Sequence, residues 1–208
     1  MNSLTALFIS AFVTLFVVID PLGCGPIFAG LTAGTPVSHR RNMAVRSTLV
    51  ATAILGGFAL VGQVFLNYLG VSLAAFRIAG GIMLFLIALE MVFEKRTARR
   101  TERAEGVMAT EHEDISIFPM GIPMIAGPGS IASAMLLMAR AHGLVAHLVM
   151  FGALASVMVL MLLSLLVAGP LMAVVGVKIE AVITRILGVI LGALAVQFVL
   201  DGLNAGLQ

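Results

Sequence analysis

The stretch Val18-Ile-Asp-Pro-Leu-Gly-Cys-Gly-Pro-Ile-Phe28 interrupts an apolar run that begins at Leu4 and is long enough to cross a bilayer. It places a carboxylate, two prolines and two glycines in the middle of that run. Irregular backbone inside a membrane is tolerated only where protein or a water-filled cavity satisfies its polar groups. A second interruption, Gly121-Ile-Pro-Met-Ile-Ala-Gly-Pro-Gly-Ser130, lies about half a chain later. Paired interruptions at matching places in two halves are typical of a transporter's binding site.

The composition is that of an integral membrane protein with one domain, residues 1–208. Of its residues, 61% are apolar and 11% are charged, whereas a soluble domain has about 45–50% apolar and about 25% charged residues. The formal net charge is only +2, so no nucleic-acid partner is expected. The single cysteine, Cys24, excludes an intramolecular disulfide and a cysteine zinc site. The four histidines form no ligand motif, so we expect no metal and no cofactor.

Six membrane spans fit the hydropathy pattern, because a helical crossing needs about 20 mainly apolar residues. The N-terminus lacks the basic region and cleavage site of a signal peptide, so the first apolar run is expected to be a retained span. The expected spans cover residues 4–31, 46–66, 72–93, 115–138, 143–167 and 179–200, and residues 94–114 form a charged loop.

The distribution of Lys and Arg predicts the orientation, since cytoplasmic loops are enriched in them. Three arginines lie near the first loop, five basic residues lie in the loop 94–114, and Lys178 lies in the fifth loop. The opposite side offers Arg140 and little else. We therefore expect both termini to be periplasmic and residues 94–114 to be cytoplasmic, where the basic cluster can also attract the head groups of membrane lipid.

The two halves of the chain resemble each other. Arg77-Ile-Ala-Gly-Gly-Ile-Met-Leu84 is matched 108 residues later by Arg185-Ile-Leu-Gly-Val-Ile-Leu-Gly192, and Pro21 is followed 107 residues later by Pro128. Each unit holds three spans, an odd number, so the second copy must insert upside down. The predicted fold is all-α, with six transmembrane helices in two inverted repeats, about 1–93 and 115–208. Helices 1 and 4 are expected to be broken near the midplane.

The breaks contain the candidate substrate-binding residues. A broken helix exposes N–H groups at one half-helix end, which suit a carboxylate, and C=O groups at the other, which suit an ammonium. Glycine lets the backbone approach a ligand closely, although tight packing of helices through small residues is the alternative reading. Ser133, after the second break, can also donate a hydrogen bond. The candidates are Gly23, Cys24 and Gly25 in the first break, and Gly127, Gly129 and Ser130 in the second.

Asp20 is the only acid inside an apolar span at membrane depth. Intramembrane acids are costly and mark ion or proton paths, or the partner of a substrate ammonium. The alternative is that Asp20 caps the second half-helix, with Pro21 at the first helical position. Both roles can coexist in one residue.

At this point the residues carry a family likeness. Asp20-Pro-Leu-Gly-Cys-Gly-Pro-Ile-Phe28 with Leu31-Thr32, and Phe118-Pro-Met-Gly-Ile-Pro-Met-Ile-Ala-Gly-Pro-Gly-Ser-Ile-Ala-Ser133, resemble the two signature motifs of the MarC family. The resemblance implies a six-span bacterial inner-membrane protein. It also implies relatives that transport small neutral amino acids such as glycine and alanine, coupled to a cation or proton. Cys24 occupies a place where the family usually has Asn, which would alter the solute if that Asn contacts it.

Four functions compete. The first is a secondary transporter of small neutral solutes, and a homo-oligomer is compatible with it. The second is a non-transporting membrane or stress-related protein. The third is a redox relay through Cys24, which lacks the second thiol that a relay needs. The fourth is an intramembrane hydrolase at Ser130, which needs a positioned base. We expect a transporter and not an enzyme.

Overall fold

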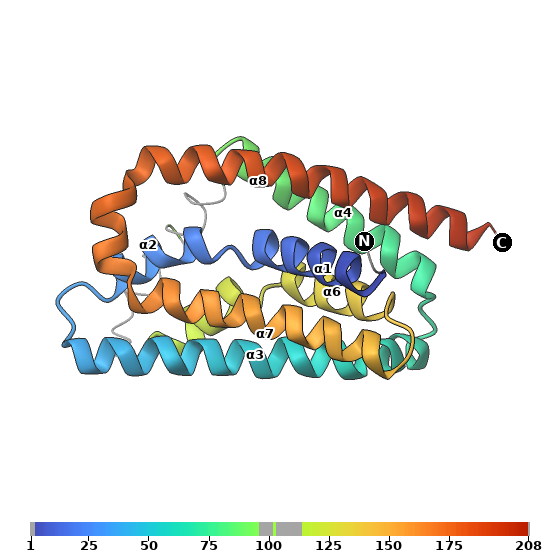
Figure 1. Cartoon of the computed structure of the whole chain (residues 1–208), viewed down its shortest axis with the longest axis horizontal. Coiled ribbons are helices and arrows are strands. Elements are labelled where there is room, and N and C mark those ends of the chain that lie inside the picture. Colours follow the sequence, from blue (N-terminus) through green and yellow to red (C-terminus); the bar gives the residue numbers. More distant parts are fainter. Residues whose placement is uncertain (1–2, 96–101, 103–113, 208) are drawn as a thin grey trace.

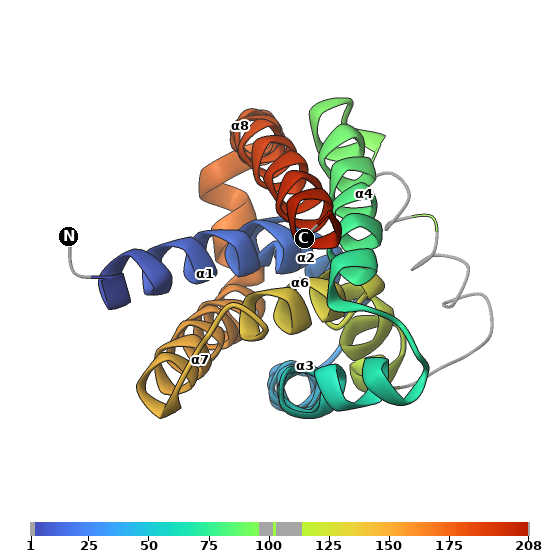
Figure 2. The ribbon, with the colours of Figure 1, turned by 90° about the vertical axis from the view of Figure 1, so that its right-hand side faces the viewer.

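The computed structural model describes residues 3–95, 102 and 114–207, and in these residues the only regular secondary structure is helical. The helices are α1 (Ser3–Ile19), α2 (Pro21–Leu31), α3 (Val37–Tyr68), α4 (Leu73–Val92), η1 (Ser116–Ile125), α6 (Pro128–Met138), α7 (Leu144–Leu166) and α8 (Ala168–Gly206). Helices α3 and α7 and most of α8 run along the length of the molecule (Figure 1), whereas α1, α4 and α6 are inclined to it (Figure 2).

Five helical stretches of the described chain are long and apolar enough to cross a membrane, and the bent pair η1–α6 makes up to six. The multi-pass, all-helical class is therefore confirmed. The bounds agree with the expected spans except at two places, α3 and α8. Helix α3 begins at Val37, directly after Pro36, and so extends well before the expected start at residue 46.

The fifth span ends at Leu166, within one residue of the expected end, but the loop expected between it and residue 179 is wrong. The backbone there already belongs to α8, which begins at Ala168 and continues to Gly206. Pro170 is the third residue of this helix, where a missing N–H leaves no intrahelical hydrogen bond unmade. The chain therefore passes from α7 to α8 without a long loop, and Figure 1 shows the first part of α8 crossing the end of the bundle before the helix turns along it.

Both chain ends lie at the same end of the bundle (Figure 1). Such an arrangement follows from an even number of crossings. The end-on view in Figure 2 places α2 and α6 near the centre, with α3, α4, α7 and α8 around them. Burial agrees with this view, because 56% of the most apolar window in Leu4–Leu31 is buried, against 28% in α3 or α4. The outer helices keep apolar faces that suit contact with lipid.

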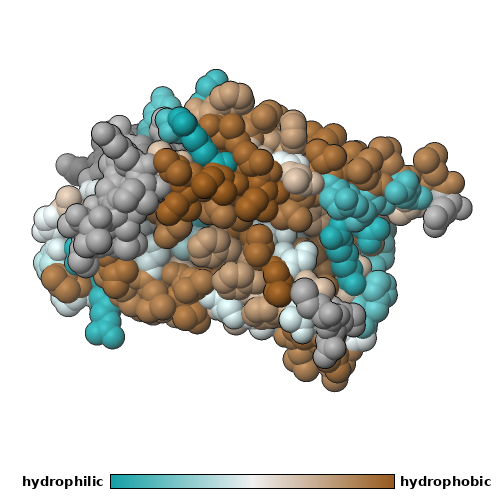
Figure 3. Space-filling view, turned by 45° about the horizontal axis from the view of Figure 1, so that its top comes forward, coloured by the Kyte–Doolittle hydropathy of each residue, from teal (hydrophilic) through white to brown (hydrophobic). Residues whose placement is uncertain are grey.

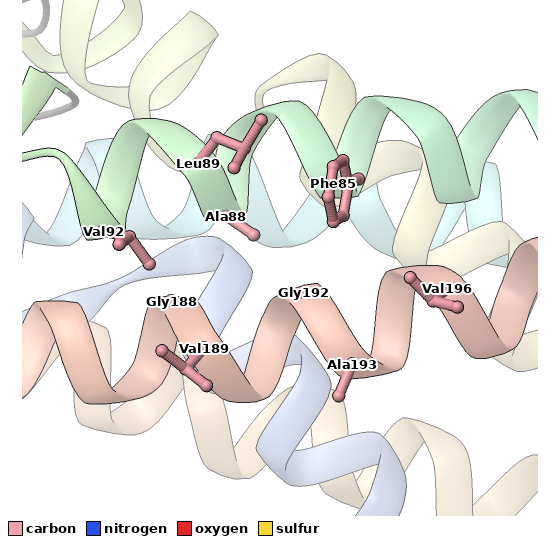
Figure 4. Close-up of a pocket in the computed structure, with 9 residues that line it drawn as sticks. All are labelled: Phe85, Ala88, Leu89, Val92, Gly188, Val189, Gly192, Ala193 and Val196. Atoms are coloured by element: carbon pink, nitrogen blue, oxygen red, sulfur yellow. The ribbon is translucent and has the colours of Figure 1, made fainter.

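Helices α4 and α8 form an antiparallel pair held by small residues. A Cβ at Gly188 would lie 2.8 Å from the Met91 Cβ, and one at Gly81 would lie 2.8 Å from the Ala195 carbonyl oxygen. Such distances are possible only where glycine lets two helices approach closely. Figure 4 shows the shallow apolar groove, about 490 Å³, that this pair leaves along its outer side. In Figure 3 hydrophobic residues cover the middle of the visible face and hydrophilic ones gather toward its ends, as expected for a membrane-spanning surface.

Candidate functional site

The first interruption is a single residue, Asp20. Its φ of 60° and ψ of 67° are left-handed, so the helix stops at Ile19 and restarts at Pro21. The Asp20 Oδ1 accepts a hydrogen bond from the Gly23 N–H at 3.0 Å, which makes Asp20 the N-cap of α2. Aspartate suits this place because it tolerates the left-handed region and caps well, and proline is favoured directly after the cap.

The two candidate glycines of α2 have packing partners. A Cβ at Gly23 would collide with the carboxylate of Asp20, so glycine is needed there for the cap itself. A Cβ at Gly25 would lie 2.9 Å from the Ser164 Oγ of α7. That hydroxyl donates to the Pro21 carbonyl oxygen at 2.5 Å and ties the start of α2 to α7. Cys24 is buried, and its thiol lies 3.7 Å from the Ile19 carbonyl oxygen.

The second interruption is longer. In η1, Phe118 and Ile122 have extended dihedral angles, and η1 is bent by 55° from α6. Helix α6 starts with Gly127 as an extended N-cap and Pro128 at its first position. Since glycine has no side-chain oxygen, no side chain caps this helix, and its first N–H groups point out of the helix end with the positive end of its dipole.

The two interruptions lie side by side. A Cβ at Gly129 would lie 3.6 Å from the Val18 Cγ1, two residues before Asp20, and would collide with Ile87 of α4. Helix α2 also contacts η1. Asp20 and Ser130 are 4% and 3% exposed, and Asp20 is the only buried acid in the described part of the chain. The structure thus brings the Asp20 break and the Gly127–Ser130 turn into one buried region.

Several of the other charged side chains in the described residues form ion pairs. Arg46 contacts Asp114 at 2.6 Å, and Arg185 contacts Glu94 at 2.6 Å. The hydroxyl and backbone N–H of Ser116, followed by Arg46, hold the pKa of Asp114 below its ordinary value. Among the described residues, no three His, Cys, Asp or Glu side chains gather into a possible metal site.

Sequence reasoning did not find the residues that other helices contribute. Ser164 of α7 bonds to the first break, and Ile87 of α4 packs on Gly129. Neither lies in a motif, and each is an ordinary residue of an apolar helix. Only the packing of the helices identifies them.

A comparison with family models settles the family. The model for MarC family integral membrane proteins matches residues 5–207. This chain belongs to the MarC family. Among curated MarC-type relatives, it is 37% identical to the UPF0056 membrane protein MJ1677 of Methanocaldococcus jannaschii, over 96% of this chain and 97% of the relative.

Bacterial members of the MarC family match over similar lengths. The UPF0056 membrane protein YvbG of Bacillus subtilis is 32% identical over 94% of this chain and 93% of its own. The UPF0056 inner membrane protein YhgN of Escherichia coli is 34% identical over 94% of this chain and 95% of its own. No solved structure matches this MarC-family chain.

Proposed function

We propose that this MarC-family protein is a secondary transporter of small neutral amino acids or similar small solutes in the bacterial inner membrane, coupled to protons or another cation. The observation that carries the proposal is the meeting of two helix interruptions, Asp20 and Gly127–Ser130, around the only buried acid of the described chain. Discontinuous helices that meet inside a membrane form the sites of many secondary transporters.

The helix contacts support an inverted repeat. Helix α1 packs on α7 as η1 packs on α3, and α2 packs on α7 as α6 packs on α3. The contact of α2 with α8 has its counterpart in the contact of α6 with α4. Each pair follows if the half containing α1–α4 corresponds to the half containing η1–α8. In this arrangement the two breaks are equivalent positions near the membrane midplane, within a single domain.

The chemistry of the breaks favours a small zwitterion. The uncapped start of α6, with Gly129 and Ser130, offers donors to a carboxylate. Asp20 and the carbonyl end of α1 offer acceptors to an ammonium or a proton. The tight packing of Gly129 against Ile87 and its nearness to Val18 favour a solute with a small side chain. In this proposal Gly23, Cys24 and Gly25 form the α2 wall of the site, although the first and last of them also serve packing.

Transport is favoured over catalysis at Ser130. A serine nucleophile needs a base within hydrogen-bond reach. The buried polar side chains of the described residues include no histidine and no lysine. A non-transporting membrane or stress-related protein is the second candidate, because the relatives' names state a membrane protein and no solute.

Uptake into proteoliposomes tests the proposal. The purified protein is reconstituted, and entry of radiolabelled glycine and alanine is measured with and without an imposed pH gradient, beside protein-free liposomes. We expect saturable uptake that the gradient accelerates and that unlabelled glycine or alanine competes away. Uptake no faster than in protein-free liposomes, for a folded protein and a panel of small amino acids, would favour the non-transporting alternative.

A further inference from the structure

Ser133 of α6 is fully buried, at 0% exposure, and its hydroxyl has no hydrogen-bond partner within the described part of the chain. A buried hydroxyl without a partner is costly, because its bonds to water are lost and not replaced. Native proteins keep few such groups, so a specific one calls for an explanation.

Other hydroxyls of this protein make a local hydrogen bond that the Ser133 hydroxyl does not make. Six of them donate to the carbonyl oxygen four residues earlier, which is the local solution for Ser and Thr in helices. These are the hydroxyls of Thr14, Thr32, Ser47, Thr48, Thr52 and Ser156. The equivalent acceptor for Ser133 is the Gly129 carbonyl oxygen, and it is not used. The Ser133 hydroxyl therefore lacks the local partner that the other six hydroxyls have.

The position of Ser133 relates it to the second break. Ser133 lies four residues after Gly129, on the same face of α6, and helical side chains lean toward the N-terminus of their helix. The Ser133 side chain is therefore expected to lean toward Gly129, beside which Ile87 of α4 also packs. Gly129 in turn faces Val18, two residues before the first break.

We infer that Ser133 is a ligand-binding residue whose hydroxyl, together with the N–H groups of Gly129 and Ser130, donates hydrogen bonds to a carboxylate. The inference rests on the proposed function and deepens it. All three groups are donors on the α6 side of the site, so the solute presents an acceptor there and its ammonium toward Asp20. A small amino acid fits, and an amine that lacks the carboxylate does not.

The test uses the full-length protein in detergent, with Ser133→Ala beside the wild type. Ser164→Ala is the matched control, because the Ser164 hydroxyl is also buried but has a partner, the Pro21 carbonyl oxygen. Thermal unfolding without ligand and calorimetric binding of glycine and of methylamine are measured for each. Methylamine is glycine without its carboxylate.

We expect Ser133→Ala to unfold no earlier than the wild type, since it loses an unpartnered group, while Ser164→Ala unfolds earlier. Glycine should bind Ser133→Ala at least about tenfold more weakly, as expected for losing one hydrogen bond to a charged group. Methylamine should bind weakly and equally to the wild type and Ser133→Ala.

Three results would overturn the inference while leaving the proposed function intact. They are wild-type affinity for glycine in Ser133→Ala, an equal loss of glycine and methylamine binding, and a thermal destabilisation matching that of Ser164→Ala. If the wild type itself neither binds nor transports glycine or alanine, the proposed function fails, and that result is visible without any variant.

Discussion

At the scale of single residues, Asp20 meets two demands at once. Its backbone must be left-handed, and its carboxylate must accept the N–H of Gly23. Asparagine meets both demands, and alanine meets neither. The two roles considered for Asp20, capping and coupling, can therefore be separated by substitution.

Asp20→Asn should fold with nearly unchanged thermal stability but lose the pH dependence of transport. The amide oxygen can still cap α2, while no group there can bind or release a proton. Asp20→Ala should be destabilised by about 1–3 kcal/mol, because both the cap and the tolerance for the left-handed region are lost. Thermal unfolding and uptake at several pH values check this. If Asp20→Asn transports with the wild-type rate and pH profile, Asp20 is only a cap.

Gly129→Ala should clearly reduce the rate of uptake, while its thermal stability should fall only slightly. The new Cβ would meet the tip of the Ile87 side chain, which is flexible, and would project between the two breaks. Gly56→Ala in α3 is the control, because a Cβ there meets nothing within 4 Å. It should raise stability by up to about 1 kcal/mol, the helix preference of alanine over glycine. Equal uptake by the two variants would contradict a site at Gly129.

Asp114 should contribute stability at every pH except a strongly acidic one. Its folded pKa is lowered, so its contribution is complete above the ordinary value of 3.8 and is lost as the pH falls through the lower folded pKa. Thermal unfolding measured from pH 6 down to about 3 should show a steeper loss for the wild type than for Asp114→Asn. Parallel curves would mean that the Ser116 and Arg46 contacts do not stabilise the folded state.

The sequence allowed the position of Asp20 and the break at Pro21 to be predicted, because Asp-Pro and the clustered glycines are local signals. The reasons for the individual glycines could not be predicted. Gly23 is required by the cap, and Gly25 by a serine 143 residues beyond Pro21. Those partners depend on side-chain placement and on helix packing, neither of which a motif contains.

At the scale of helices, hydropathy was sufficient to predict the spans, because lipid requires long apolar helices wherever the chain crosses. It did not predict α8 correctly. Gly169-Pro170 is a break signal inside a helix but is harmless in its first turn, and hydropathy does not show where a helix begins. The close approach of α4 and α8 was likewise not predicted, although their glycines are plain in the sequence.

Gly188→Ala should destabilise the protein, whereas Gly192→Ala, one turn later in α8, should not. At Gly188 the new Cβ would lie 2.8 Å from the Met91 Cβ and 3.1 Å from the Ala88 carbonyl oxygen, so the helices must separate. Overpacking of this kind costs about 1–3 kcal/mol. At Gly192 the nearest atom would be 3.7 Å away, an ordinary contact. Equal melting temperatures of the two variants in the same detergent would refute the close α4–α8 packing.

At the scale of the whole molecule, the two termini share one end of the bundle and the charged segment 94–114 joins α4 to η1. The excess of Lys and Arg in the loops opposite the termini predicts which side is which. The fold places the two termini at one end of the bundle, and the distribution of Lys and Arg predicts that this end faces the periplasm.

Alkaline phosphatase fused after Leu207 should therefore be active, and fused within residues 94–114 it should be inactive. The enzyme works only in the periplasm, so its activity reports the side of each junction. A fluorescent-protein fusion at each place serves as the reciprocal control, with immunoblots to show that all fusions are produced. An inactive but fully produced C-terminal fusion would reverse the orientation.

The hydrogen bond from Ser164 to the Pro21 carbonyl oxygen has a consequence for biosynthesis. The Pro21 carbonyl oxygen opens the second half of the first span, and this bond reaches it from α7. As the chain leaves the ribosome, the first span enters the membrane long before α7 has been made, and it must meanwhile do without the Ser164 bond. The first span therefore reaches its final form late, and chains truncated before α7 should be preferred targets of membrane proteases.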